Sequence, residues 1–263
     1  MLEQDTELLY HVSLNSAQST TLVLLHGLSS SHLEFTPILP HLTQYHLLVP
    51  DLPAHSRSIH HAPFIVPHAA RLVASLIRAR AHSQKCHLVG FSAGGFIAVE
   101  LASTYPELVQ SLFVSGVYDL AAKWGWMIGV APYMSIIEGL APTSLISFIY
   151  RRMGLQLPTG LLEELSANGK VAMLKVAWKS LGEFNGEREV HVRSLALAGE
   201  KQDDVEGVRR LGRVFRKGNE LSRAAVVEGA MHWWSLQWPE LFANGVVKWI
   251  EEKELPSRFK ILD

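Results

Sequence analysis

The sequence contains very little cysteine. Cys86 is the single cysteine in 263 residues, so the chain cannot form an internal disulfide. Cys86 lies in an apolar run, where a thiol ordinarily serves as a buried packing residue. A chain without disulfides suits a reducing compartment, and we expect a cytoplasmic protein.

Runs of one charge sign are also missing. The formal net charge is −1, and lysine and arginine form no long cluster. This balance does not favour a nucleic-acid partner or an anionic membrane surface.

Long apolar runs are scarce as well. The first ten residues, MLEQDTELLY, are acidic and lack the apolar stretch of a secretory signal. The most apolar stretch outside the expected strands, residues 124–134, contains Gly and Pro and is too short to cross a bilayer. We therefore expect no membrane span, and the oligomeric state stays open.

What the sequence has is a regular alternation of two patterns. Near-continuous apolar segments are typical of strands covered on both faces of a parallel sheet, and they occur at residues 20–27, 45–51, 85–91, 111–117, 194–199 and 224–230. Helical patterns lie between or after them at 66–81, 93–104, 204–216 and 239–253. A strand at about residues 7–13 could pair at the edge. The alternation predicts an α/β fold, a mostly parallel sheet with helices on both faces.

One segment interrupts this alternation. Residues 119–190 show no convincing strand and are rich in Trp, Met and Leu. We interpret them as a helical insertion above the sheet, with residues 1–118 and 191–263 forming the core.

A glycine-rich turn surrounds one serine. Gly90, Ser92 and Gly94 form the pattern G-x-S-x-G between an expected strand and an expected helix. The pattern alone is weak, but this context is the one that a nucleophile elbow requires. Side chains at Gly90 and Gly94 would collide with neighbouring backbone in so sharp a turn. Ser92 is therefore a candidate nucleophile at the carboxyl end of the sheet.

A serine hydroxyl needs a base, and His232 is the best placed of thirteen histidines. It follows the last predicted parallel strand and precedes the last long helix, so it lies at the same sheet edge as Ser92. Its imidazole could take the Ser92 proton and pass it to a leaving group.

Two aspartates could orient this histidine. Asp203 and Asp204 both follow the strand at residues 194–199. We favour Asp203 as the acid, because Asp204 is better placed to open the next helix, but the sequence leaves both open.

Backbone amides could stabilise the oxyanion that such a serine would create. Ala93 directly follows the candidate nucleophile. A second donor should come from the loop after an early strand, where His26 and Gly27 precede Leu28. We expect the amides of Leu28 and Ala93 to form the oxyanion hole.

Together these motifs resemble the α/β-hydrolase family. Ser92, Asp203 and His232 occur in the chain order of that family, and the resemblance covers nearly the whole chain. It implies that the insertion is a cap over the active site.

Two departures from the family pattern stand out. Ala54 and Ser56 occupy positions where many relatives have glycine, so the loop after Asp51 could bend differently. Relatives that act as epoxide hydrolases or haloalkane dehalogenases carry aspartate as nucleophile, and Ser92 argues against both activities.

The leading hypothesis is a serine hydrolase that cleaves an ester or related acyl bond of an apolar or aromatic small molecule through an acyl-enzyme. This chemistry needs no metal and no organic cofactor. Lactone, thioester, amide or carbon–carbon (diketone) hydrolysis on the same residues stays open, and so does a ligand receptor with little turnover.

Overall fold

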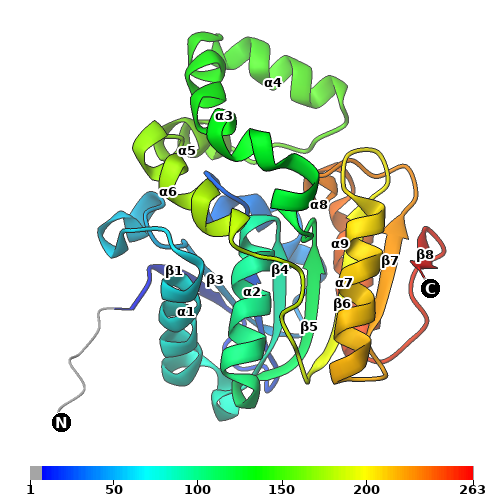
Figure 1. Cartoon of the computed structure of the whole chain (residues 1–263). Coiled ribbons are helices and arrows are strands. Elements are labelled where there is room, and N and C mark those ends of the chain that lie inside the picture. The colour runs from blue at the N-terminus through cyan, green and yellow to red at the C-terminus, as the bar shows by residue number, and fades with distance from the viewer. Residues whose placement is uncertain (1–7, 263) are drawn as a thin grey trace.

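An eight-stranded sheet forms the centre of the computed structural model, which describes residues 8–262 (Figure 1). The spatial order is β1-β3-β2-β4-β5-β6-β7-β8. The strands are β1 (His11–Leu14), β2 (Thr21–Leu25), β3 (His46–Pro50), β4 (Cys86–Phe91), β5 (Val109–Ser115), β6 (Arg193–Gly199), β7 (Arg223–Val227) and β8 (Phe259–Leu262). Strands β2 to β7 are parallel to one another, whereas the edge strands β1 and β8 are antiparallel to β3 and β7.

The fold class predicted from the sequence is confirmed, with two differences at the edges. The N-terminal edge strand begins at His11, and Glu7, the start of the predicted strand, lies outside the described residues. Strand β8 was not predicted, because it has only four residues and buries just Phe259 and Leu262. So short a segment carries almost no periodic signal.

Helices cover both faces of the sheet (Figure 1). Helices α1 (Val66–Arg80), α2 (Ala93–Thr104) and α7 (Val205–Gly218) pack on one face, and α9 (Pro239–Ile250) packs on the other behind the short α8 (Trp234–Gln237). Helix α9 ends three residues before the predicted boundary. Short 3₁₀ helices occupy the loops: η1 (His32–Phe35), η2 (Leu39–His41), η3 (Ser56–His61), η4 (His82–Gln84) and η5 (Pro106–Leu108).

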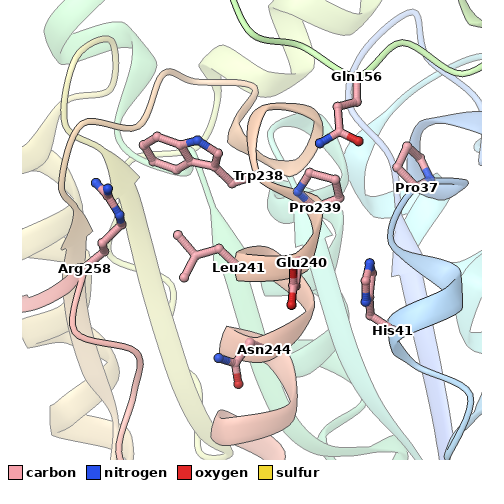
Figure 2. Close-up of a pocket in the computed structure, with 9 residues that line it drawn as sticks. All are labelled: Pro37, His41, Gln156, Trp238, Pro239, Glu240, Leu241, Asn244 and Arg258. Atoms are coloured by element: carbon pink, nitrogen blue, oxygen red, sulfur yellow. The ribbon is translucent and has the colours of Figure 1, made fainter.

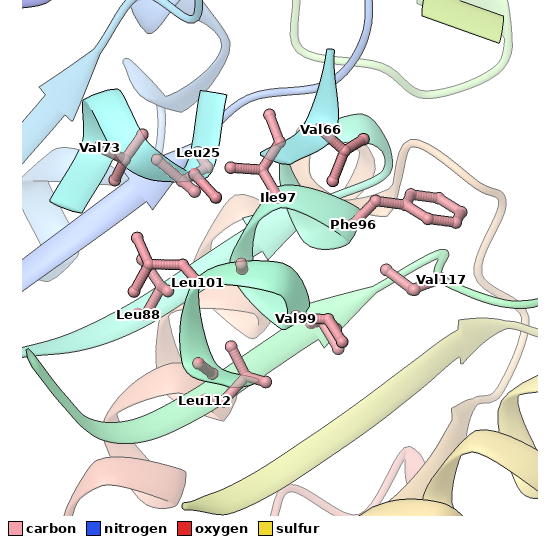
Figure 3. Close-up of a cluster of buried hydrophobic side chains, with 14 of the residues drawn as sticks. Leu25, Val66, Val73, Leu88, Phe96, Ile97, Val99, Leu101, Leu112 and Val117 are labelled. Carbon is pink, nitrogen blue, oxygen red and sulfur yellow. The ribbon is translucent and has the colours of Figure 1, made fainter. Parts of the chain in front are cut away.

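Alternating strand residues supply the two cores. In β2, Val23 and Leu25 face α1 and α2, whereas Leu22 and Leu24 face the other layer. This follows from the period of two along a strand. Figure 3 shows Ile97 and Leu101 of α2 packed among the strand side chains. The site described below therefore stands on a rigid base.

The segment between β5 and β6 is helical and contains no strand. Its helices are α3 (Leu120–Leu140), α4 (Thr143–Arg152), α5 (Leu161–Asn168) and α6 (Val171–Gly182). Helix α3 starts five residues after the carboxyl end of β5, is kinked at Trp124 and continues through Pro132. In Figure 1 the four helices lie at the top, beyond the sheet edge at which β5 ends. Across residues 8–262, no helix is long and apolar enough to cross a membrane.

Candidate active site

Ser92 occupies a sharp turn between β4 and α2. Its backbone has φ 49° and ψ −121°, a conformation that costs energy for any residue with a Cβ. The turn is held by hydrogen bonds, because Ser92 N donates to Ser115 O at 2.8 Å and Gly95 N donates to Ser92 O at 2.8 Å. The surrounding structure thus stabilises a strained residue, as functional turns commonly do.

The two glycines of the motif are required by close backbone contacts. A Cβ at Gly90 would lie 2.6 Å from Gly94 O. A Cβ at Gly94 would overlap the carbonyl of Leu25. Since neither backbone can move away, glycine is needed at both positions.

His232 and Asp203 meet at the same edge of the sheet. His232 Nδ1 lies 2.5 Å from Asp203 Oδ1. The other carboxylate oxygen of Asp203 accepts the N–H of Gly199 at 2.7 Å, which fixes the carboxylate. The Asp203 side chain is fully buried, whereas the His232 side chain is 35% exposed. The imidazole is thus held from one side and open on the other.

Asp204, the alternative acid, has other partners. Its carboxylate lies 3.7 Å from Lys123 Nζ and 3.6 Å from an Arg210 guanidinium nitrogen. It immediately precedes α7. Of the two aspartates, only Asp203 contacts His232 in the described chain.

Opposing effects act on the pKa of His232. Burial lowers it, but the charge and hydrogen bond of Asp203, together with the charge of Glu34, raise it above the usual value for histidine. The site therefore favours imidazolium, the form that a general base adopts after taking a proton. Within residues 8–262, the Ser92 hydroxyl and His232 are not hydrogen-bonded, and such contacts often tighten only when substrate is bound.

A glycine next to His232 leaves room for the imidazole ring. Gly116 follows β5 with φ +73°, and a Cβ there would lie 2.6 Å from His232 Cε1. The neighbouring Trp234 indole donates to Ser115 Oγ at 2.8 Å and ties the histidine loop to β5. Neither contact could be predicted from the sequence, because a single glycine or serine after a strand has no distinctive pattern.

The two expected oxyanion donors lie on adjoining segments. Ala93 is the first residue of α2, so its N–H has no partner in the preceding helical turn. Leu28 follows Gly27 after β2, and β2 pairs with β4 up to Leu25 and Gly90. The close approach of Gly94 to Leu25 and His26 brings the start of α2 against this loop.

His26 has a structural role in this loop. It is fully buried, its Nε2 accepts the N–H of Leu52 at 2.9 Å, and its Nδ1 lies 2.8 Å from Gly27 O. Burial, with the nearby His55, lowers the pKa of His26 to about 3. His26 is therefore a neutral residue that fixes the loop.

The insertion packs on both loops around Ser92. The Asn168 amide at the end of α5 donates to Ser29 O at 3.2 Å, in the loop that carries Leu28. Met231 and Trp233, which flank His232, pack with residues of α5 and the segment before it, including Leu155, Leu161 and Leu165. Helix α5 and the segment before it thus contact both loops beside the candidate site.

A polar contact joins the insertion to the core. The Asn168 amide of α5 donates to Ser30 O at 2.9 Å and accepts the N–H of Ser56 at 2.7 Å. Ser56 has φ 44° and Ala54 has φ 64°, so both adopt the left-handed conformation that glycine favours. The Ser56 hydroxyl donates to Glu164 Oε2 at 2.5 Å. The departure from glycine at this position therefore provides a contact with α5.

A separate groove lies beside α9 and has a volume of about 580 Å³ (Figure 2). On one side of the groove, the Arg258 guanidinium carbon lies over the Trp238 ring, 4.9 Å from the ring centroid. Its lining residues are Pro37, His41, Gln156, Trp238, Pro239, Glu240, Leu241, Asn244 and Arg258. None of the residues predicted for the site lines it, so we base the candidate site on Ser92, His232 and Asp203. Among residues 8–262, no cluster of three His, Cys, Asp or Glu side chains is arranged to hold a metal ion.

Comparisons with known proteins agree with this architecture. Residues 20–129 match the sequence pattern of the alpha/beta hydrolase fold. An AB hydrolase superfamily protein of Gibberella zeae is 30% identical over 256 residues, which is 92% of this chain and 84% of that protein. The chain belongs to the α/β-hydrolase superfamily.

More distant relatives of this α/β hydrolase include an esterase. The pimeloyl-[acyl-carrier protein] methyl ester esterase of Aeromonas hydrophila is 33% identical over 119 residues, 44% of each chain. The crystal structure of MGS-M2, an alpha/beta hydrolase enzyme from a Medee basin deep-sea metagenome library, is 16% identical with a TM-score of 0.70. It covers 91% of this chain and 92% of its own, and it supports the fold alone.

Proposed function

We propose that this α/β hydrolase is a serine esterase that acts on a small apolar or aromatic acyl compound. The observation that carries the proposal is the 2.5 Å contact between His232 Nδ1 and Asp203 Oδ1, at the sheet edge where the strained Ser92 stands. A nucleophile, a base and an orienting acid are the minimum for this chemistry. The relationship to a methyl ester esterase supports the same reaction type.

In the proposed reaction, Ser92 Oγ attacks the carbonyl carbon of the ester while His232 Nε2 takes its proton. Asp203 holds the Nδ1–H and stabilises the imidazolium. The amides of Leu28 and Ala93 stabilise the oxyanion of the tetrahedral intermediate. His232 then protonates the leaving alcohol, and a water molecule that it deprotonates releases the acid from the acyl-enzyme.

The apolar character proposed for the substrate rests on the apolar side chains near the candidate site. Met231 and Trp233, on either side of His232, pack with Leu155 and Leu161 of the insertion, and the Phe184 ring meets Phe96 of α2 edge to face at 5.2 Å. Ligand pockets commonly have such apolar linings around a few polar groups. We propose that residues 119–190 act as a cap that covers this acyl or alcohol group.

The test uses four variants with p-nitrophenyl esters of increasing acyl length. Ser92→Ala and His232→Ala should lose at least about a thousandfold in kcat/KM, because acylation requires both groups. Asp203→Asn should also lose activity strongly, whereas Asp204→Asn is expected to keep most of it. A fluorophosphonate probe should label Ser92 in wild type and not label Ser92→Ala.

Circular dichroism of each variant provides the control for folding. Near-wild-type turnover in folded His232→Ala would contradict the assignment of the base. Loss of activity in Asp204→Asn alone would contradict the choice of Asp203. Ligand binding at full strength without any turnover of esters would favour a receptor-like protein instead.

A further inference from the structure

Glu34 is a fully buried carboxyl group that the proposed mechanism leaves unused. It lies in η1, and its Oε2 accepts the N–H of Gly27 at 3.0 Å. Its other oxygen, Oε1, has no hydrogen-bond partner among the described residues. A buried carboxyl group with so few partners is costly, so its presence requires a reason.

The surroundings of Glu34 connect both loops of the site. Ser30 Oγ and Trp233 Nε1 are also buried, and both lie close enough to the Glu34 carboxyl group to interact with it and lower its pKa. Ser30 belongs to the loop that carries Leu28, and Trp233 follows His232 directly. Three buried polar side chains thus gather between the oxyanion loop and the histidine loop.

Contacts through the Phe91 ring connect this carboxyl group with the imidazole of His232. The Phe91 ring lies 5.1 Å from the His232 ring, centroid to centroid. A Cβ built on Gly27 would lie 3.2 Å from the Phe91 ring and 3.5 Å from Glu34 Oε2. Glu34, Gly27 and Phe91 therefore form one contact group next to His232.

We propose that Glu34 is a second acid of the active site, a positioning residue that holds the Gly27 end of the oxyanion loop and whose negative charge stabilises protonated His232. The inference rests on the proposed function. It differs from the role of Asp203, which touches the imidazole, because Glu34 acts through the field of its charge and through Gly27.

The titration behaviour of the two groups agrees with this inference. Burial raises the pKa of Glu34 to about 7, although Gly27, Ser30, Trp233 and the charge of His232 each act to lower it. Glu34 in turn acts to raise the pKa of His232, and Asp203 is the other acid that faces this ring. A carboxyl group whose pKa lies near 7 and a histidine beside it titrate as a coupled pair, so the protonation of each group depends on that of the other.

The experiment separates the charge of Glu34 from its hydrogen bond. Glu34→Gln keeps an acceptor for Gly27 but removes the charge, so the pKa of His232 should fall by about one unit. The acid limb of the kcat/KM profile should move to lower pH by the same amount, and kcat/KM on its plateau should fall by up to about tenfold. The pKa of His232 is measured by NMR on the full chain with isotope-labelled histidine, and the signal that is missing in His232→Gln identifies this residue.

Glu34→Asp keeps the charge and weakens the hydrogen bond, the reverse of Glu34→Gln. Its shorter side chain cannot hold Gly27 at the same distance. The pKa of His232 should stay near the wild-type value while kcat falls, because the oxyanion loop loses its anchor. Glu107→Gln, on an exposed carboxylate paired with Arg78, is the matched control and should change neither quantity.

The outcomes decide the inference. An unchanged His232 titration in folded Glu34→Gln overturns it, whatever happens to the rate. If Glu34→Gln does not fold, the reciprocal measurement replaces it: the carboxyl signal of Glu34 should titrate at higher pH in His232→Gln than in wild type, and an unchanged midpoint overturns the inference. A coupling seen by NMR in a protein without esterase turnover would contradict the proposed function and leave the charge coupling intact.

Discussion

At the scale of single residues, the candidate site depends on a few atoms that must approach closely. Ser92 adopts a strained conformation because Gly90 and Gly94 allow the backbone of α2 to touch β2 and β4. This strain is stored in one residue and is balanced by hydrogen bonds and packing around it. The steric condition can be tested without any assay of activity.

We predict that Gly94→Ala lowers the free energy of unfolding by about 3 kcal/mol or more, because the new methyl group overlaps the Leu25 carbonyl and neither backbone can yield. The matched control is Gly129→Ala in α3, where a Cβ meets nothing within 4 Å. There alanine should raise stability by roughly 0.5–1 kcal/mol, since glycine weakens a helix interior. Urea unfolding measures both, and equal effects would contradict the steric argument.

At the scale of elements, the insertion is joined to the core at a small number of polar contacts. Asn168 at the end of α5 is only 4% exposed, and its amide bonds the backbone of Ser30 and Ser56. Ser30 lies two residues after Leu28. The position of α5 and the position of the oxyanion loop are therefore coupled through one side chain.

We predict that Asn168→Ala costs about 2–3 kcal/mol of stability, because the Ser56 N–H and the Ser30 carbonyl lose their partner in a buried place. The loosened oxyanion loop should also lower kcat by several-fold. Asn185→Ala is the control, since the exposed Asn185 side chain accepts the N–H of the nearby Glu187. Thermal unfolding and ester kinetics are the measurements, and identical behaviour of the two variants would show that the contact does not couple the insertion to the loop.

At the scale of the whole molecule, buried histidines determine how stability responds to acid. Burial lowers the pKa of His26 to about 3 and that of His55 to about 4. In the unfolded chain both titrate near 6.5. Between about pH 4 and 6.5 the unfolded state therefore binds protons that the folded state does not, and stability falls as pH falls. Glu34, with its pKa raised to about 7, acts in the opposite direction: between about pH 4.5 and 7 its contribution to stability rises as pH falls. Glu34 therefore partly offsets the effect of His26 and His55.

We predict that His55→Asn reduces the dependence of the unfolding free energy on pH by about 1.4 kcal/mol per pH unit between pH 4.5 and 6. The absolute stability also falls, because His55 accepts the N–H of Ser29 at 3.0 Å, so the slope is the decisive quantity. His191→Asn, at an exposed histidine, is expected to keep the wild-type slope. Urea unfolding at a series of pH values makes the comparison, and equal slopes in all three proteins would disprove the prediction.

The sequence by itself determined the α/β class and the helical character of residues 119–190, because apolar runs and helical periods are local patterns that survive in one dimension. The turn around Ser92 was also readable, since a tight strand-to-helix turn demands glycine at a fixed spacing. Only the tertiary structure shows that the two adjacent aspartates have different partners: Asp203 contacts His232, whereas Asp204 lies near Lys123 and Arg210. It also revealed Glu34 and Asn168, whose burial depends on segments far away in the chain. A polar residue in a loop has the same appearance in sequence whether water or a buried partner surrounds it, and that difference arises only when the loops pack together.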